Sequence, residues 1–215
     1  MKEYPQSHIA EDMATTILEA KAITFDSKNG FRWKSGIWSP FYSDLRILMS
    51  KVDDRTKTTD HLLSSMDRGA YDLIAGTATA AIVWATSIAD ALRLPLAYVR
   101  SSEKDHGKQN LVEGIVNPED RTLVCEDAIS TAESSINAAN ALREKGAIAD
   151  DILGIMTYGL EKSVEDAGNQ GITIVTATDF PTVMHLAEEG EYWLPSQVKV
   201  VKEWHRDPYG WKPSG

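Results

Sequence analysis

The sequence predicts an α/β domain whose central sheet is mostly parallel and is covered by helices on both faces. The first observation behind this prediction is a change of rhythm at Tyr71. From there on, short apolar segments of strand length alternate with longer segments that have helical spacing. The second observation is that helices separate the strands. Strands connected in this way pair in parallel and are buried on both faces. The chain has 215 residues, 42% of them hydrophobic, which is enough for one domain with a sizeable core.

The first fifty residues differ from the rest. Apolar residues recur at helical spacing over 9–21 and predict an amphipathic opening helix. The pair Asn29-Gly30, set between two short apolar runs, is typical of a tight turn and predicts a β-hairpin. A second extended stretch is expected over 41–49, directly after Pro40.

The alternating part of the chain gives five strands and three helices. A good helix stop at Lys145-Gly146 ends the helix that follows Ser134. Strands are expected at 71–75, 96–100, 122–125, 152–158 and 172–177, and helices at about 78–93, 133–145 and 179–189.

Composition excludes several classes of protein. The net charge of −10, from 22 Lys and Arg against 32 Asp and Glu, argues against a nucleic-acid partner. No apolar run approaches the roughly 18 residues that a membrane helix needs, and the polar N-terminus does not resemble a signal peptide, so we expect a cytoplasmic protein without a membrane partner. The single cysteine, Cys125, excludes an internal disulfide and a cysteine-rich metal site, and its apolar strand makes it a core residue.

The segment after residue 121 carries the strongest functional signal. An apolar strand ends in Glu126 and Asp127, and a short turn leads into a helix. Ligands of parallel sheets bind at the carboxyl ends of strands, and a helix N-terminus binds phosphate through its free amides. The acids would hold sugar hydroxyls or water on Mg²⁺, whereas the alternative is a plain capped helix start. The hydroxyl donors of the turn are Ser130, Thr131, Ser134 and Ser135.

The polar segment 101–114 has two interpretations. Its dense charge and two glycines fit a solvated surface hairpin. Long polar loops in compact domains are also often active-site lids.

Several segments in order resemble one family. The strand, the acid pair, the hydroxyl-rich turn and the helix resemble the phosphoribosyl-diphosphate (PRPP) motif of type I phosphoribosyltransferases. Further segments resemble orotate phosphoribosyltransferases: the orotate-side segment at 31–46, the pyrophosphate loop within 72–85, the catalytic loop at 98–114 and the ending at 203–211. This resemblance favours the lid interpretation of the polar segment.

The resemblance implies a fold, a reaction and an assembly. The fold would be that of a type I phosphoribosyltransferase, a single domain over 1–215 in which about 1–50 form a small N-terminal hood. The reaction would transfer a phosphoribosyl group from PRPP to orotate, giving orotidine 5′-monophosphate and pyrophosphate for pyrimidine nucleotide synthesis. Mg²⁺ would be held mainly through PRPP near Glu126 and Asp127, with no direct protein ligand. A homodimer with shared active sites is also implied.

The resemblance also assigns residues to roles. The catalytic set would be Arg100, Lys104, His106 and Asp127. The PRPP-binding set would be Gly76, Thr77, Arg100, Lys104, His106, Glu126, Asp127, Ala128, Ile129, Ser130, Thr131, Ala132, Glu133 and Ser134. The orotate-binding set would be Lys34, Phe41, Tyr42 and Ser130.

The chain departs from the family at several anion-binding positions. The family usually carries glycine where this chain has Ala132, and glycine or a small residue at Glu133. It often has glycine at Ala81 and another lysine at Ser101 or Ser102. If position 132 needs a left-handed backbone, alanine costs roughly 1–2 kcal/mol. Glu133 either faces the phosphate or points to solvent.

These departures leave two alternatives to the transferase. One is a related protein that senses a nucleotide or ribose phosphate with weak or no catalysis, and the other is the same reaction on another base. No glycine-rich dinucleotide fingerprint follows any strand, which argues against a dehydrogenase. The remaining candidates fit surface, packing or dimer roles because they lack metal-ligand spacing or a binding cage: His61, His185, His205, Trp204 and Trp211.

Overall fold

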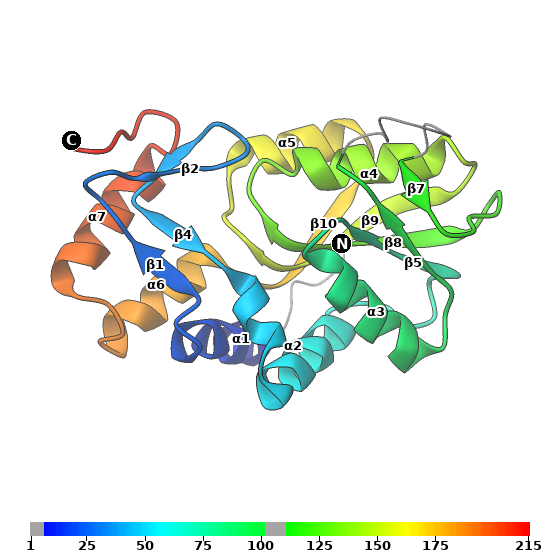
Figure 1. Cartoon of the computed structure of the whole chain (residues 1–215), viewed down its shortest axis with the longest axis horizontal. Coiled ribbons are helices and arrows are strands. Elements are labelled where there is room, and N and C mark those ends of the chain that lie inside the picture. The colour runs from blue at the N-terminus through cyan, green and yellow to red at the C-terminus, as the bar shows by residue number, and fades with distance from the viewer. Residues whose placement is uncertain (1–6, 102–110) are drawn as a thin grey trace.

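The structure, a computed structural model, describes residues 7–101 and 111–215. Its core is a sheet in the order β10-β9-β8-β5-β6-β7 (Figure 1), and every neighbouring pair is parallel except β6 with β7. The mostly parallel sheet predicted from the sequence is thereby confirmed. Its strands are β5 (Leu73–Thr77), β6 (Leu96–Val99), β7 (Val112–Glu113), β8 (Arg121–Ile129), β9 (Ile148–Thr157) and β10 (Thr173–Asp179).

Helices cover both faces of the sheet, as expected. Side chains alternate along β8, so that Leu123 and Cys125 point into one hydrophobic cluster and Val124 into the other. Cys125 is buried, which confirms it as a core residue. The first face is covered by α1 (Ser7–Glu19), α2 (Val52–Ser64) and α3 (Ala81–Leu92), and the second by α4 (Glu133–Arg143) and α5 (Glu161–Asn169).

A smaller lobe beside the sheet is built from both ends of the chain (Figure 1). Its strands form two antiparallel pairs, and two C-terminal helices pack beside them. The lobe therefore contains more than the N-terminal hood expected from the sequence. Its elements are β1 (Ile23–Phe25), β2 (Phe31–Arg32), β3 (Trp38–Ser39), β4 (Phe41–Ser43), α6 (Phe180–Glu189) and α7 (Pro195–Arg206).

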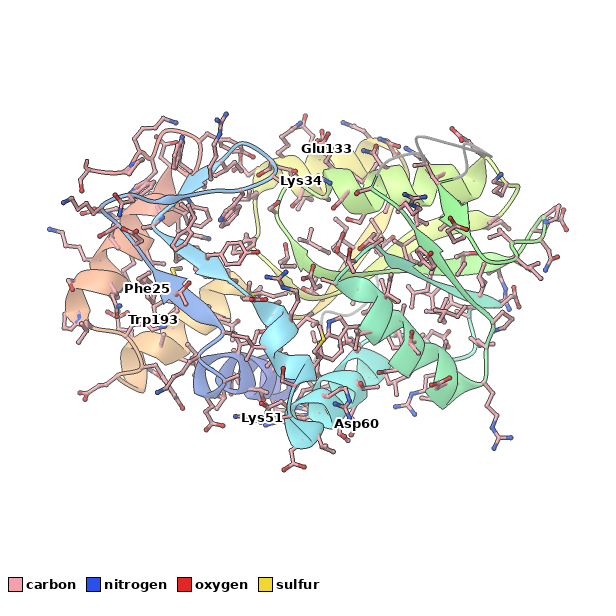
Figure 2. The ribbon with its side chains drawn as sticks, in the orientation of Figure 1. Phe25, Lys34, Lys51, Asp60, Glu133 and Trp193 are labelled. Carbon is pink, nitrogen blue, oxygen red and sulfur yellow. The ribbon has the colours of Figure 1, made fainter. Side chains whose placement is uncertain are left out.

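Aromatic side chains hold this lobe together. Phe41 stacks on Phe180 with ring centroids 4.7 Å apart, and Trp204 meets Phe41 edge-on at 4.9 Å. Phe25 and Trp193 lie side by side at 5.1 Å (Figure 2). Trp204 also donates a hydrogen bond from its ring nitrogen to a backbone carbonyl, which confirms its packing role.

The predicted hairpin around Asn29-Gly30 is wrong. The turn itself forms, since the amide of Gly30 donates to the Asp26 carbonyl at 2.8 Å, but the flanking strands do not pair with each other. Instead β1 pairs with β4, and β2 pairs with β3 through a second turn that ends at Gly36, where φ is 85°. The extended stretch expected over 41–49 is also shorter, because Asp44 caps the 3-10 helix η1 (Leu45–Met49).

Helices α2, α5 and α7 were absent from the sequence prediction. Their sequences are rich in charged residues, and the residues that α5 buries, Ser163 and Ala167, are small and give a weak apolar signal. Helix α7 does carry Val198, Val201 and Trp204 at three-residue spacing, a helical pattern that the sequence prediction missed. Strand β8 extends to Ile129, so the two acids lie inside its carboxyl end instead of after it. Within residues 7–101 and 111–215, no helix has the length and apolar character needed to cross a membrane.

Candidate active site

A large cavity lies at the carboxyl ends of the central strands β5, β6 and β8. Its volume is about 590 Å³, and a neighbouring cavity of about 250 Å³ surrounds the start of α4. The larger cavity is lined by Lys34, the segments Thr77–Ala80 and Val99–Ser101, Leu111, Glu126, Asp127 and one side of α4. Both cavities share Lys34, Ser101, Ser134 and Asn137, so they form one continuous site.

The turn between β8 and α4 leaves a helix N-terminus open to this site. Ala132 stands at the N-cap with φ 61° and ψ 5°, which confirms that position 132 takes a left-handed backbone. No side chain caps α4, so its first-turn amides point into the smaller cavity without a capping acceptor. The alternative interpretation from the sequence, a helix start capped by a side chain, is therefore not what the structure shows. An open N-terminus next to hydroxyl side chains is suited to phosphate.

The left-handed alanine is tolerated for reasons visible in its surroundings. A non-glycine residue in this conformation costs roughly 1–2 kcal/mol. The Ala132 methyl is buried against the second hydrophobic cluster, and a buried methyl contributes about 0.8 kcal/mol. Glycine would also lose roughly 0.5–1 kcal/mol in backbone entropy. These contributions nearly cancel, so alanine and glycine are about equally stable at this position.

Glu133 begins α4 and lines the smaller cavity. Its side chain is exposed, and Figure 2 shows it near Lys34, which lines the same cavity. The negative charge in the first helical turn opposes the helix dipole favourably without a ligand. Glu133 lines the cavity in which the turn would hold an anion, so the effect of its charge on substrate binding is a prediction.

The two acids of β8 have different surroundings. Glu126 is only 7% exposed, and its two oxygens accept hydrogen bonds from Thr77 Oγ1 at 2.6 Å and Ser134 Oγ at 3.0 Å. Burial, together with the neighbouring charge of Asp127, raises the pKa of Glu126 to about 7. Asp127 is less buried, lines the cavity and accepts one bond from the amide of Ala128 at 2.8 Å. Asp127 is therefore the carboxylate available to a ligand.

The pyrophosphate-loop residues divide between packing and the cavity. A Cβ placed on Gly76 would lie 2.9 Å from Ala85 Cβ, so this glycine allows α3 to approach β5. Gly76 and Ala81 are buried and do not line the two cavities, whereas Thr77–Ala80 line the larger one. The departure at Ala81 therefore lies in the core.

Arg100 follows β6 and lines the larger cavity. Its Nη1 lies 3.9 Å from Glu113 Oε1 on β7, which pairs with β6. Arg100 and Lys34 are the two cations that line the larger cavity within the described part of the chain. The predicted Lys104 and His106 lie outside the described residues.

Of the four residues expected on the base side, the structure brings Lys34 to both cavities and Ser130 to the smaller one. The ring of Phe41 is 0% exposed and lies in the aromatic cluster of the smaller lobe. Tyr42 is 40% exposed and packs on Phe31 with ring centroids 5.8 Å apart. Neither ring lines the cavities described above.

Among the lining residues that sequence reasoning did not assign to the site, two line both cavities. Asn137 lies one helical turn after Glu133 on the same side of α4 and lines both cavities. Ser101 follows Arg100 and also lines both. Helical spacing from the phosphate turn was the signal that would have identified Asn137.

Comparisons with known proteins agree with this geometry. No family model matches the chain. Orotate phosphoribosyltransferases of Coxiella burnetii and Listeria monocytogenes are 35% and 37% identical to it, over 95% and 94% of this chain and 99% and 98% of theirs. The crystal structure of orotate phosphoribosyltransferase from Aeropyrum pernix has a TM-score of 0.72 and 28% identity, covering 83% of this chain and 98% of that one. UMP synthase of Leishmania donovani shares the fold with a TM-score of 0.79, at 21% identity, over 92% of this chain and 42% of that one.

The parallel sheet, with an acid pair and an open helix start at its carboxyl edge, defines a type I phosphoribosyltransferase. The Coxiella burnetii and Listeria monocytogenes enzymes share more than 30% identity with this chain over nearly their whole length. The chain belongs to the orotate phosphoribosyltransferase family.

Proposed function

We propose that this protein transfers the 5-phosphoribosyl group of PRPP to orotate. In this reaction a ring nitrogen of orotate forms a bond to ribose C1 and releases its proton to pyrophosphate or water. The bond from C1 to the pyrophosphate oxygen breaks, and its electron pair leaves with pyrophosphate. The products are orotidine 5′-monophosphate and pyrophosphate. The observation that carries the proposal is a pair of adjoining cavities whose shared lining brings together an open helix start, the Asp127 carboxylate and two cations.

Each part of PRPP has a complementary group in this cavity. The 5′-phosphate is assigned to the first-turn amides of α4 and the hydroxyls of the 130–134 turn. The ribose hydroxyls are assigned to Asp127, and the pyrophosphate to the Thr77–Ala80 segment with Arg100. Lys104 and His106 join them by resemblance to the family. Catalysis then depends on orientation and on stabilising the charge of the leaving group.

Mg²⁺ is proposed to bind mainly through the oxygens of PRPP. No group of three or more His, Cys, Asp or Glu side chains able to hold a metal ion occurs within residues 7–101 and 111–215. Asp127 supplies a hard oxygen donor at the cavity, the type that Mg²⁺ prefers, so the site fits an ion that is carried by substrate. The bound ion would neutralise the charge that develops on pyrophosphate.

Family resemblance supports the assembly and the location that we propose. The protein would be a cytoplasmic homodimer of a single-domain chain, in which Lys104 and His106 of one protomer serve the site of the other. A net charge of −10 supports small anionic substrates rather than nucleic acid as partners.

A second candidate is a sensor of nucleotide or ribose phosphate. The carboxylate of Glu133 at the phosphate turn favours it, because this charge weakens anion binding. One assay separates the candidates: the loss of orotate absorbance with PRPP and Mg²⁺, for the wild type and for Asp127→Ala. An enzyme consumes orotate and loses turnover in the variant, whereas a sensor binds PRPP in calorimetry without turnover. Uracil offered in place of orotate tests whether another base is used.

A further inference from the structure

Thr77 ends β5 next to the cavity, yet its hydroxyl bonds to a protein group. Thr77 Oγ1 lies 2.6 Å from Glu126 Oε1 and 3.4 Å from the carbonyl oxygen of Cys125. A hydroxyl has one proton to donate, and the shorter contact has the length of a charge-assisted hydrogen bond. Thr77 is 6% exposed, so its hydroxyl is held inside the protein and directed at Glu126.

Glu126 depends on this bond because its other partners are weaker. Ser134 Oγ and the amide of Asp127 donate to it at 3.0 and 3.2 Å. Ser134 is exposed, so its hydroxyl can leave Glu126 and donate to a bound phosphate instead. Within residues 7–101 and 111–215, no cation forms an ion pair with Glu126. A buried carboxylate without hydrogen bonds is costly, so the bond from Thr77 fixes where its oxygens lie.

We propose that Thr77 is a positioning residue that acts through Glu126. Its hydroxyl links the end of β5, which lines the pyrophosphate side of the cavity, to the acid pair on β8, which lines the ribose side. The Glu126 carboxylate in turn accepts a bond from the Asp127 amide and so holds the backbone next to the ligand-facing acid. This inference rests on the proposed phosphoribosyl transfer and assigns the Thr77 hydroxyl a role other than direct contact with PRPP.

The first test compares three threonine variants in the orotate assay. Thr77→Val keeps the shape of the side chain without its donor, and kcat/KM for PRPP is expected to fall roughly 10- to 100-fold, with KM for orotate changed less than about twofold. Thr77→Ser restores the donor and is expected to recover activity to within about threefold. Thr178→Val is the matched control, because this buried strand threonine donates to the Ala10 carbonyl at 2.7 Å, away from the cavity, and we expect no change beyond about twofold.

The second test is a double-mutant cycle with Glu126→Ala. If Thr77 acts through Glu126, then adding Thr77→Val to Glu126→Ala lowers kcat/KM for PRPP by less than about twofold, because the acceptor of its hydrogen bond is already absent. If turnover of Glu126→Ala is too slow to measure, the cycle is repeated on the affinity for PRPP with Mg²⁺ by calorimetry.

Two results would overturn the positioning role. The first is an equal loss from Thr77→Val in both backgrounds, which would mean that Thr77 contacts the substrate directly. The second is full activity of Thr77→Val. A wild type that binds PRPP without turnover would instead refute the proposed reaction, and the calorimetric cycle would still decide the role of Thr77.

Discussion

Replacing Glu126 with glutamine is expected to stabilise the ligand-free protein above neutral pH while it lowers activity. The pKa of Glu126 is raised to about 7 in the folded state, chiefly by burial and then by Asp127, against a usual value of about 4.5. The folded state therefore favours the protonated form. The stability that this group contributes is fully present below pH 4.5 and is lost as the pH rises through 7. Glutamine keeps the shape without the charge: its oxygen can still accept from Thr77 and the Asp127 amide, and its NH2 group donates to the Ser134 hydroxyl, which can turn to accept.

The size of the effect follows from the shift. Each pKa unit corresponds to about 1.4 kcal/mol, so the shift of Glu126 sets an upper bound of about 3 kcal/mol at pH 8. Coupling to Asp127 reduces this bound, and we expect a gain of about 1–3 kcal/mol at pH 8. At pH 5 the gain is expected to be below about 1 kcal/mol, because the carboxylate is then mostly protonated in the folded state. For a domain of this size the gain at pH 8 corresponds to roughly 2–12 °C in Tm.

The assay is thermal unfolding of the wild type and Glu126→Gln between pH 5 and 8, without substrate. Asp72→Asn is a control of opposite sign, because hydrogen bonds from Arg121 lower the pKa of Asp72 to about 2. This variant is expected to lose stability at neutral pH, and the loss shrinks as the pH falls toward 2. A Glu126→Gln protein that is no more stable than the wild type at pH 8, or that gains as much at pH 5, would refute the argument that burial penalises this carboxylate.

Three further predictions concern the substrate site. Glu133→Gln is expected to tighten PRPP binding in calorimetry about fivefold if its carboxylate reaches the phosphate, since one screened charge pair is worth about 1 kcal/mol, and equal affinities would place this side chain in solvent. Lys104→Ala and His106→Ala are expected to depress turnover while stability changes by less than about 0.5 kcal/mol; a sharp drop in Tm with normal activity per folded molecule would contradict this. Mixing Lys104→Ala with Asp127→Ala chains is expected to restore part of the activity if protomers share sites, and mixed dimers without recovery would exclude sharing.

The sequence predicted the parts of the fold that are governed by local pattern. Strands β5, β8 and β9 were predicted because each is a short apolar run between segments of helical spacing. The phosphate turn lies between a strand and a helix as expected. The pairing of β1 with β4 was not predictable from the Asn29-Gly30 turn. Which strands pair there depends on the aromatic cluster with α6 and α7, whose residues are distant in the sequence.

The candidate site was predictable in outline but not in its internal bonds. The sequence placed Glu126 and Asp127 together at a strand end, yet it treated them as equivalent. Only the structure shows that Thr77, from another strand, donates a hydrogen bond to Glu126, while Asp127 lines the cavity where a ligand can reach it. The energetic cost of alanine at position 132 was predicted for the case of a left-handed backbone, and the structure shows that the backbone there is left-handed. The methyl burial that offsets its cost required the packing of α4.

The most direct test of the site assignment is a crystal structure of the protein with PRPP and Mg²⁺. We expect the 5′-phosphate within hydrogen-bonding distance of the first-turn amides of α4 and the ribose hydroxyls at Asp127. We further expect Thr77 Oγ1 to remain bonded to Glu126 in the complex. A phosphate bound away from the 130–134 turn, or a ribose that does not contact Asp127, would contradict the site proposed for this chain.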